Sequence, residues 1–175
     1  AFPAGARPLV EVEPILPGLR TASRDRQQSA LAMLFPGPNR GDPARHAAEV
    51  WGAIAGGLGG RLFESLRSAR SLAYTVMASS WQRRRAGGLL TYIAMAPERL
   101  EEAREAMLEE LAVFRAEPPT ADELHRATAM LAGQEEVARQ SAAAVAGEIA
   151  DAWLLGEGLA ELADPAAPYR AVTRE

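Results

Sequence analysis

An arginine and a tyrosine that stand seven positions apart are the residues of this chain best suited to chemistry. Arg67 falls in an amphipathic segment that predicts a helix, and Tyr74 falls in the strand predicted to follow it. Arginine offers planar, permanently charged donors, and a tyrosine hydroxyl can donate to an oxygen on which negative charge develops. Held close together, the two side chains could grip a peptide carbonyl. On spacing alone, an exposed helix arginine and an ordinary strand tyrosine are the simpler interpretation.

A glycine-rich turn stands just before this segment. It comprises Gly56, Gly57, Gly59 and Gly60. Four glycines in five residues cost too much backbone entropy to lie inside a helix, so we expect a flexible or closely packed turn. A phosphate-binding loop would continue into a lysine and a serine or threonine, and this turn does not.

Two charged clusters are better explained as solvated surface than as binding sites. Arg83, Arg84 and Arg85 have neither the aromatic platform nor the wider basic stripe of a nucleic-acid site, so we expect a hairpin tip. Five glutamates over residues 101–110 are mixed with Arg99 and Arg104 at i,i+3 and i,i+4 spacings, which predicts ion pairs along an exposed face and not a metal cluster.

The elements around these residues indicate an α+β fold. Strands are predicted over residues 28–35, 72–81 and 89–95, and a short one over residues 7–12. The first of these is read as a buried strand, and the next two as an antiparallel hairpin. Helices are predicted over residues 43–55, 61–69, 97–117, 120–139 and 141–155, with Gly156 and Gly158 ending the last one and one turn near Tyr169.

Two local signals fix where helices begin. Asp42 can cap a helix that has Pro43 at its first position, and Thr120 with Glu123 forms a capping box. Strands followed by segregated helices indicate a mainly antiparallel sheet with helices packed on one face.

Composition fits one soluble-type globular domain and excludes several function classes. The chain has 175 residues, a net charge of −4 and no cysteine. Its acidity argues against nucleic acid as the main partner, and the lack of cysteine excludes disulfides and thiolate metal sites. No apolar run approaches the roughly 20 residues of a membrane span, and no signal peptide is visible at the start.

The segment GGLGGRLFESLRSARSLAYTV resembles the signature of the inactive half of the insulinase/pitrilysin family of zinc metallopeptidases, which includes mitochondrial processing peptidases and two-subunit bacterial enzymes. QSALAMLFPGP, DPARHAAEVWGAIAGG, PPTADELHRATAMLAG and YRAVTRE resemble further segments of that half, so the likeness covers residues 21–175. Arg67 and Tyr74 occupy the family's arginine and tyrosine places. Gly60 stands where the family often has serine and Ser71 where it often has glycine, and neither departure removes a catalytic group.

The resemblance also separates this chain from the catalytic half, which carries the zinc motif H-x-x-E-H. Here His46 and Glu49 match its first and fourth positions, but Val50 replaces the second histidine. We therefore expect no metal on this chain, with zinc held by a partner domain. His46, Glu49 and His125 are expected to be exposed helix residues.

The family likeness implies a role and a domain arrangement. We expect an extended connector or linker remnant over residues 1–20 and a single inactive domain over residues 21–175, truncated before its last helix and strand. This domain would bind peptide substrate and help a zinc-bearing H-x-x-E-H domain or subunit hydrolyse it. Tyr74 would donate to the scissile carbonyl, and Arg67 would hold a neighbouring carbonyl or orient Tyr74.

Alone, the chain should be inactive as a zinc metalloendopeptidase. The alternative is a non-catalytic structural or assembly subunit of the same fold, like the core proteins of respiratory complexes, in which Arg67 and Tyr74 serve packing only. The sequence leaves a cytoplasmic or a periplasmic location open.

Overall fold

The computed structural model describes residues 16–155 and 160–174. The strand predicted over residues 7–12 and the helix-ending Gly156 and Gly158 lie outside this part of the chain. Within it, no helix is both long enough and apolar enough to cross a membrane.

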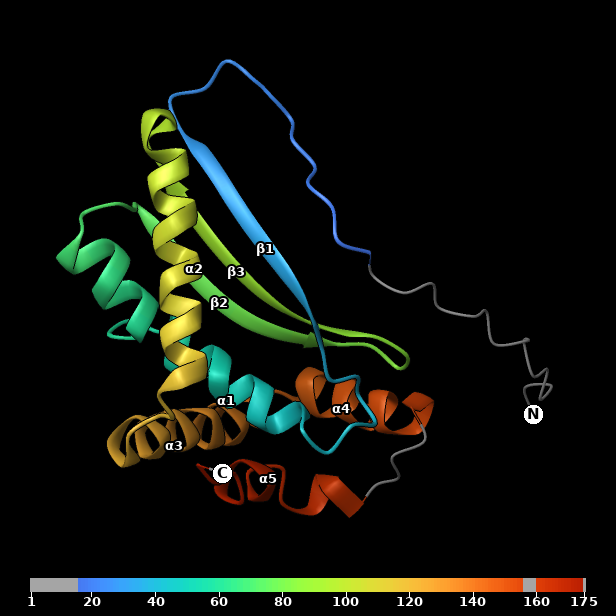
Figure 1. Cartoon of the computed structure of the whole chain (residues 1–175). Helices are drawn as coiled ribbons and strands as arrows, with labels where there is room; N and C mark the ends of the chain where they lie inside the picture. Colours follow the sequence, from blue (N-terminus) through green and yellow to red (C-terminus); the bar gives the residue numbers. More distant parts are fainter. Residues whose placement is uncertain (1–15, 156–159, 175) are drawn as a thin grey trace.

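A three-stranded antiparallel sheet forms the centre of the molecule (Figure 1). Its strands are β1 (Ser29–Gly37), β2 (Thr75–Gln82) and β3 (Gly87–Met95), in the order β1-β3-β2. The predicted β2–β3 hairpin is confirmed. The expectation that β1 is buried is wrong, because β1 lies at a sheet edge and exposes alternate residues on the face that no helix covers.

Helices cover the opposite face of the sheet and build the main core. The covering elements are the helix α2 (Leu100–Ala116), which the short 3-10 helix η2 (Pro97–Arg99) precedes, and the π-helix η1 (Phe63–Ala69). The largest fully buried apolar side chains come from these elements and from the sheet: Leu62, Leu66, Ile93, Met95 and Met107. Burying such side chains contributes about 1.5–3 kcal/mol each, so this layer fixes the sheet against η1 and α2.

The helix α1 (Arg45–Gly56) runs along the edge strand β2 at close range. The expectation that Asp42 caps a helix beginning at Pro43 is wrong, because α1 begins at Arg45 after the N-cap residue Ala44, which has no side-chain cap. Asp42 instead accepts a hydrogen bond from the Ala44 amide at 2.8 Å within the preceding turn. A methyl group on Gly56 would overlap the Ala78 backbone, and one on Gly52 would lie 3.2 Å from the Ser79 Cα atom. Small residues on α1 therefore allow helix and strand backbones to approach each other closely.

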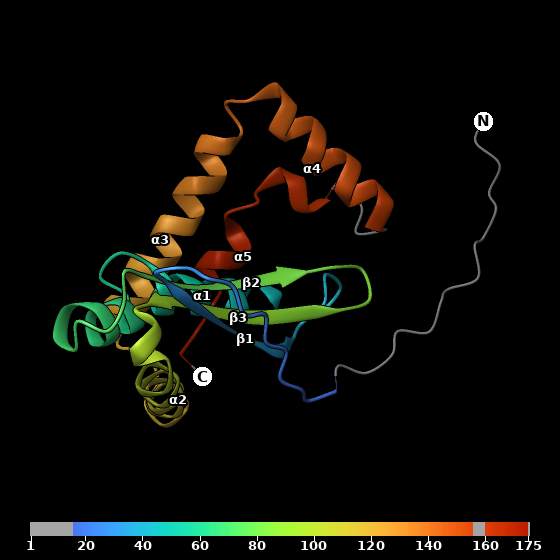
Figure 2. The same cartoon turned by 90° about the horizontal axis from the view of Figure 1, so that it is seen from above.

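The remaining helices form an arm on the side of the sheet opposite α2 (Figure 2). The arm contains α3 (Ala121–Ala138), α4 (Ala142–Leu155), η3 (Ala160–Ala163) and α5 (Ala167–Arg170). The predicted capping box of α3 is confirmed, since the Thr120 hydroxyl accepts from the Glu123 amide at 3.2 Å and the Glu123 carboxylate accepts from the Thr120 amide at 2.7 Å.

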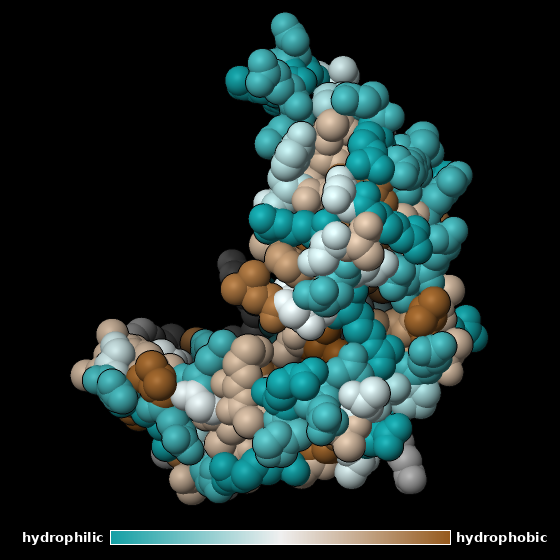
Figure 3. All heavy atoms as spheres, turned by 90° about the vertical axis from the view of Figure 1, so that its left-hand side faces the viewer, coloured by the Kyte–Doolittle hydropathy of each residue, from teal (hydrophilic) through white to brown (hydrophobic). Residues whose placement is uncertain are grey.

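The arm contacts the rest of the molecule through α1 and through the ion pair between Arg61 and Glu123 of α3. A second cluster contains Val50 and Ile54 of α1, Ala127 of α3 and Tyr169 of α5. Further out, α4 is apolar but exposed, and the Trp153 side chain is 80% accessible. The arm leaves an L-shaped outline with an open hollow, so the uncovered face of the sheet remains accessible (Figure 3). The fold class expected from the sequence, α+β with an antiparallel sheet, is confirmed.

Candidate functional site

The glycine-rich turn between α1 and η1 is closely packed. Gly59 has φ +80°, a left-handed conformation that favours glycine. A methyl group on Gly60 would lie 2.8 Å from the carbonyl oxygens of Ile54, Ala55 and Gly57. The turn therefore fixes the position at which the next helix begins.

Arg67 projects from η1, which is a π-helix where the sequence predicted an ordinary helix. The Arg70 amide donates to the Ser65 carbonyl at 3.1 Å, five residues back. Such wide turns often occur at functional sites. Arg67 is exposed, and its guanidinium lies over the Phe63 ring at 5.0 Å from the centroid.

Carboxylates of α2 hold the far side of η1. Glu110 accepts hydrogen bonds from Ser65 and from Arg70, and Glu109 accepts one from Arg70 at 3.0 Å. Arg70, the residue directly after η1, is therefore bound to α2. Arg67 is left on the exposed side of η1, above Phe63.

Tyr74 stands directly before β2, on a backbone that is already part of the sheet. Its amide donates to the Ala94 carbonyl at 2.8 Å, and its side chain is 56% exposed. Among residues 16–155 and 160–174, the Tyr74 hydroxyl has no hydrogen-bond partner. A fixed backbone thus presents a free phenolic donor at the surface.

The surroundings of Tyr74 are an open depression on the uncovered face of the sheet. Residues 25–30 line it from one side, and Tyr92 and Ala94 of β3 line it from the other. No hydrogen bond or ring contact joins Arg67 to Tyr74 within the described residues. Arg67 therefore packs on Phe63, whereas Tyr74 lies beside Tyr92 and Ala94 of β3.

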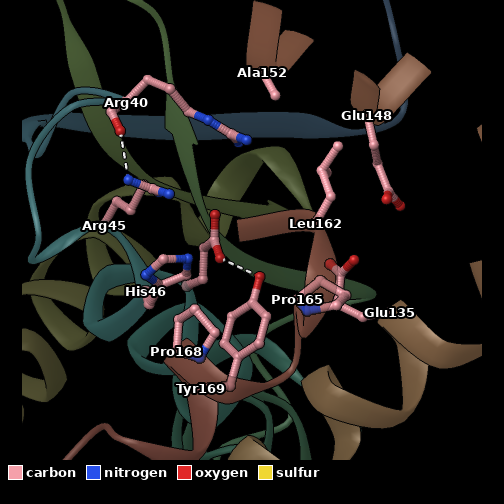
Figure 4. A pocket seen from close by; sticks show the side chains of 11 residues that line it. Arg40, Arg45, His46, Glu135, Glu148, Ala152, Leu162, Pro165, Pro168 and Tyr169 are labelled. Atoms are coloured by element: carbon pink, nitrogen blue, oxygen red, sulfur yellow. Dashed lines mark hydrogen bonds between the residues drawn. The ribbon is translucent and has the colours of Figure 1, made fainter. Parts of the chain in front are cut away.

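A second polar site, absent from the sequence expectations, lies between α1 and the arm (Figure 4). The Tyr169 hydroxyl donates to a Glu49 carboxylate oxygen at 2.5 Å. The His46 ring meets the Tyr169 ring edge-on, with centroids 5.2 Å apart. The expectation that His46 and Glu49 are exposed is wrong, because both are partly buried under α5. His125 is exposed, as expected.

Charges are crowded in this second site. Its volume is about 90 Å³, and its lining also includes Arg40, Arg45, Glu135 and Glu148. Burial, together with the hydrogen bond to Glu49, raises the pKa of Tyr169 above its usual value. Burial also raises the pKa of Glu135, and the neighbouring Glu148 and Glu49 add to this effect. We name this cluster the Tyr169 cavity. Tyr169 and Glu49 pair with each other across it, and it is too small for a peptide.

Local sequence patterns could not find the Tyr169 cavity, since Glu49 and Tyr169 are 120 residues apart. The sequence showed that His46 and Glu49 lie on one helix, but it could not show that both contact Tyr169.

No metal site is evident in the part of the chain that the structure describes, because no group of three histidine, cysteine, aspartate or glutamate side chains could hold an ion there. Val50, at the position of the missing second histidine, is buried in the cluster that joins α1 to the arm.

Comparison with known proteins identifies relatives of this arrangement. A family model described as the peptidase M16 inactive domain matches residues 3–131, which include Arg67 and Tyr74. An uncharacterized zinc protease of Mycobacterium bovis is 38% identical over 84 residues, which are 47% of this chain and 19% of that protein. An uncharacterized zinc protease of Mycobacterium leprae is 31% identical over 118 residues, or 67% of this chain and 26% of that protein. The chain thus spans a minor part of the length of these relatives.

Solved structures agree with the fold. A peptidase M16 inactive domain from Pseudomonas fluorescens has a TM-score of 0.75 and 25% identity, and the match covers 83% of this chain and 35% of that one. The inactive peptidase domain of a zinc protease from Bordetella parapertussis has a TM-score of 0.76 at 17% identity, covering 89% and 85% of the two chains. A chain of Complex III2 from Candida albicans has a TM-score of 0.74 at 16% identity, covering 87% and 39%.

The family resemblance read from the GGLGGRLFESLRSARSLAYTV segment is therefore confirmed: the chain belongs to the peptidase M16 family and represents its inactive domain.

Proposed function

We propose that this chain is the substrate-binding, zinc-free domain of an M16 peptidase and acts beside a zinc-bearing H-x-x-E-H domain. The observation that carries the proposal is the environment of Tyr74. Its backbone is fixed by the hydrogen bond to Ala94, while its hydroxyl is exposed and has no partner among the described residues. A donor held in this way can meet a group that arrives from outside.

In the assembled peptidase, the Tyr74 hydroxyl donates to the scissile carbonyl oxygen as negative charge develops on it. A donor of this kind stabilises the transition state more than the ground state, and so it accelerates the chemical step. Zinc on the partner domain supplies Lewis-acid polarisation and an activated water. Tyr74 and the zinc site would then face the same peptide bond from the two domains.

Arg67 has a positioning role in this proposal. Its guanidinium stays charged and can donate to a substrate carbonyl next to the one that reacts. Packing on Phe63 restricts the arginine without consuming its donors. The closely packed glycine turn and the carboxylates of α2 support this role, because they fix both ends of η1.

The proposal is tested by reconstitution with the zinc-bearing partner from the same source. We expect this chain alone to cleave no internally quenched peptide, and the mixture to cleave it. Tyr74→Phe should lower kcat of the mixture by about 10²-fold and leave the midpoint of thermal unfolding unchanged. Full activity of the Tyr74→Phe mixture would overturn the role of the hydroxyl.

Arg67 of η1 and Arg70, the residue directly after η1, provide a matched control. Arg67→Gln should raise KM or lower kcat, while Arg70→Gln should affect mainly stability, since Arg70 is bound to Glu109 and Glu110. Equal kinetic effects of the two substitutions would contradict a specific role for Arg67.

The second candidate is a structural subunit without catalytic function. The fold likeness to a chain of Complex III2 from Candida albicans is compatible with it. The same reconstitution separates the two candidates, because a purely structural subunit would bind its partner without conferring Tyr74-dependent cleavage.

A further inference from the structure

We propose that Arg99 is a positioning residue of the peptidase: it holds the link between Arg67 and Tyr74 in an unusual backbone conformation and so fixes these two residues relative to each other. This inference rests on the proposed function and adds to it a residue from a separate element, the N-cap of α2. The link comprises residues 70–73, between the last residue of η1 and Tyr74.

Ser71 gives the link its unusual conformation. Its φ is 51°, and within residues 16–155 and 160–174 it is the only residue other than glycine with a positive φ. A left-handed backbone brings the Cβ atom close to the following carbonyl oxygen, so this conformation favours glycine. Other contacts of the structure must therefore hold Ser71 in it.

The Arg99 guanidinium supplies such a contact. Its Nη1 atom donates to the Ser71 carbonyl oxygen at 2.9 Å. Because the direction of a carbonyl changes with the backbone conformation, a donor fixed at this point favours the left-handed form. The Nε and Nη2 atoms donate to the two carboxylate oxygens of Glu102, each at 2.9 Å. This bidentate pair orients the guanidinium towards the link.

The backbone that carries Arg99 is itself fixed. The Arg99 amide donates to the Ala96 carbonyl at 3.0 Å, directly before α2 begins. Further along α2, Ala103, Ala106 and Met107 are buried in the main core. The guanidinium therefore starts from a helix that is packed on the sheet, and it can hold the link at a defined position.

The conformation of Ser71 determines how η1 meets the sheet. Before Tyr74, the Leu72 amide donates back to the Leu66 carbonyl at 2.8 Å and so ties the link to η1. After the link, the Tyr74 amide donates to the Ala94 carbonyl at 2.8 Å and so ties it to β3. A different conformation at Ser71 would break one of these bonds or shift η1 relative to Tyr74. Misplacement of this kind slows the chemical step.

Hydrogen exchange tests the restraint without the zinc partner. Arg99→Gln should raise the exchange rate of the Leu72 amide about tenfold or more, because the link loses the contact that favours its conformation. The Ile93 amide, in the central strand, should exchange as in the unsubstituted protein. Arg104→Gln removes an arginine from an i,i+3 ion pair of the same helix and should change neither rate.

A second substitution at position 71 tests the cause of the change. Ser71→Gly in the Arg99→Gln protein should return the Leu72 exchange rate towards its original value, since glycine adopts the left-handed conformation readily. Ser71→Ala in the same protein also removes the hydroxyl but keeps the Cβ atom, so it should not restore the rate. This pair separates the backbone conformation from the loss of the serine hydroxyl.

Kinetics of the reconstituted peptidase test the effect on catalysis. Arg99→Gln should lower kcat about tenfold with little change in KM, because the donor at Tyr74 acts in the transition state. Adding Ser71→Gly should restore kcat, and adding Ser71→Ala should not. Arg104→Gln should leave kcat unchanged.

The outcomes distinguish this inference from the proposed function. An unchanged Leu72 exchange rate in Arg99→Gln, or an equal rise at Ile93, would overturn the positioning role. Cleavage that depends on Tyr74, with kcat unaffected by Arg99→Gln, would overturn it as well and leave the proposed function intact. Faster Leu72 exchange that glycine but not alanine reverses, with no cleavage by any mixture, would support the restraint of the link by Arg99 and contradict the proposed function.

Discussion

Two tyrosines of this domain lie in opposite environments. Tyr169 is 7% exposed, donates to Glu49 at 2.5 Å and meets the ring of His46. Tyr74 is 56% exposed and, within the described residues, has a hydroxyl without a partner. Burial, together with the hydrogen bond to Glu49, raises the pKa of Tyr169. By that criterion alone, Tyr169 would be the candidate for chemistry.

The difference teaches that a perturbed pKa can identify a structural link. The Tyr169 cavity brings together α1, α3, α4 and α5, and the hydrogen bond from Tyr169 to Glu49 links α5 to α1 across it. Such a link positions elements but offers little to a substrate. Tyr74 is exposed and its hydroxyl has no partner among the described residues. Such a group can bind a partner that another molecule supplies.

The largest effect is expected at the contact that joins the two regions. Gly56 packs on Ala78, so α1 with Glu49 is held against β2, which follows Tyr74. Gly56→Ala must displace backbone and should cost about 3 kcal/mol of unfolding free energy or more. Urea denaturation measures the loss. Gly133→Ala, within α3 and with nothing within 4 Å, is the control and should be neutral or stabilising. If Gly56→Ala and Gly133→Ala changed the unfolding free energy equally, the close contact between α1 and β2 would not be important for stability.

Removing each tyrosine hydroxyl in turn tests the comparison directly. Tyr169→Phe leaves the partly buried Glu49 carboxylate without its donor and should cost about 1–3 kcal/mol of stability, with kcat of the reconstituted peptidase unchanged. Tyr74→Phe should do the reverse. Chemical denaturation and peptide cleavage measure the two properties on the same samples. A kcat loss in Tyr169→Phe would contradict the structural role of that tyrosine.

The acid dependence of stability should differ in sign at two glutamates. Glu135 in the Tyr169 cavity has a raised pKa, so its protonated form is favoured by folding and its contribution falls as pH rises above the ordinary carboxyl range. Glu135→Gln should therefore stabilise the protein at pH 7, and the gain should fade towards pH 4.

Glu123 provides the matched opposite case, because its hydrogen bond from Arg61 lowers its pKa to about 2. Its contribution is present above the ordinary carboxyl pKa and is lost as pH falls towards 2. Glu123→Gln should destabilise the protein at pH 7, with a deficit that shrinks on acidification. Denaturation midpoints between pH 2 and pH 8 measure both variants. Parallel profiles for the two variants would contradict this assignment.

The smallest effect is expected for a charge that belongs to neither region. Arg104 pairs with Glu101 on the exposed face of α2, and the two side chains are 45% and 74% accessible. Arg104→Gln should change the unfolding free energy by about 0.5 kcal/mol or less, and kcat not at all. Thermal unfolding and peptide cleavage check this. A larger change would contradict the assignment of this ion pair to the solvated surface.

The sequence predicted the elements whose signals are local. The hairpin of β2 and β3, the capping box at Thr120 and the likeness around Arg67 and Tyr74 all depend on residues within one short segment. The wide turn of η1 was missed, since its apolar spacing also fits an ordinary helix. The exposure of β1 was missed because an apolar strand gives no sign of which face is covered. The Tyr169–Glu49 link depends on tertiary contact alone.

The exposed Trp153 has a consequence for observing this protein in solution. Its indole lies on α4 in the arm, whereas the Trp51 ring packs edge-on against Phe114, with centroids 6.2 Å apart, and Trp81 lies in the hairpin beside Arg83. The three indoles therefore emit from three different surroundings. Collisional quenchers such as acrylamide reach Trp153 first, so intrinsic fluorescence can follow the arm separately from the sheet without an added label.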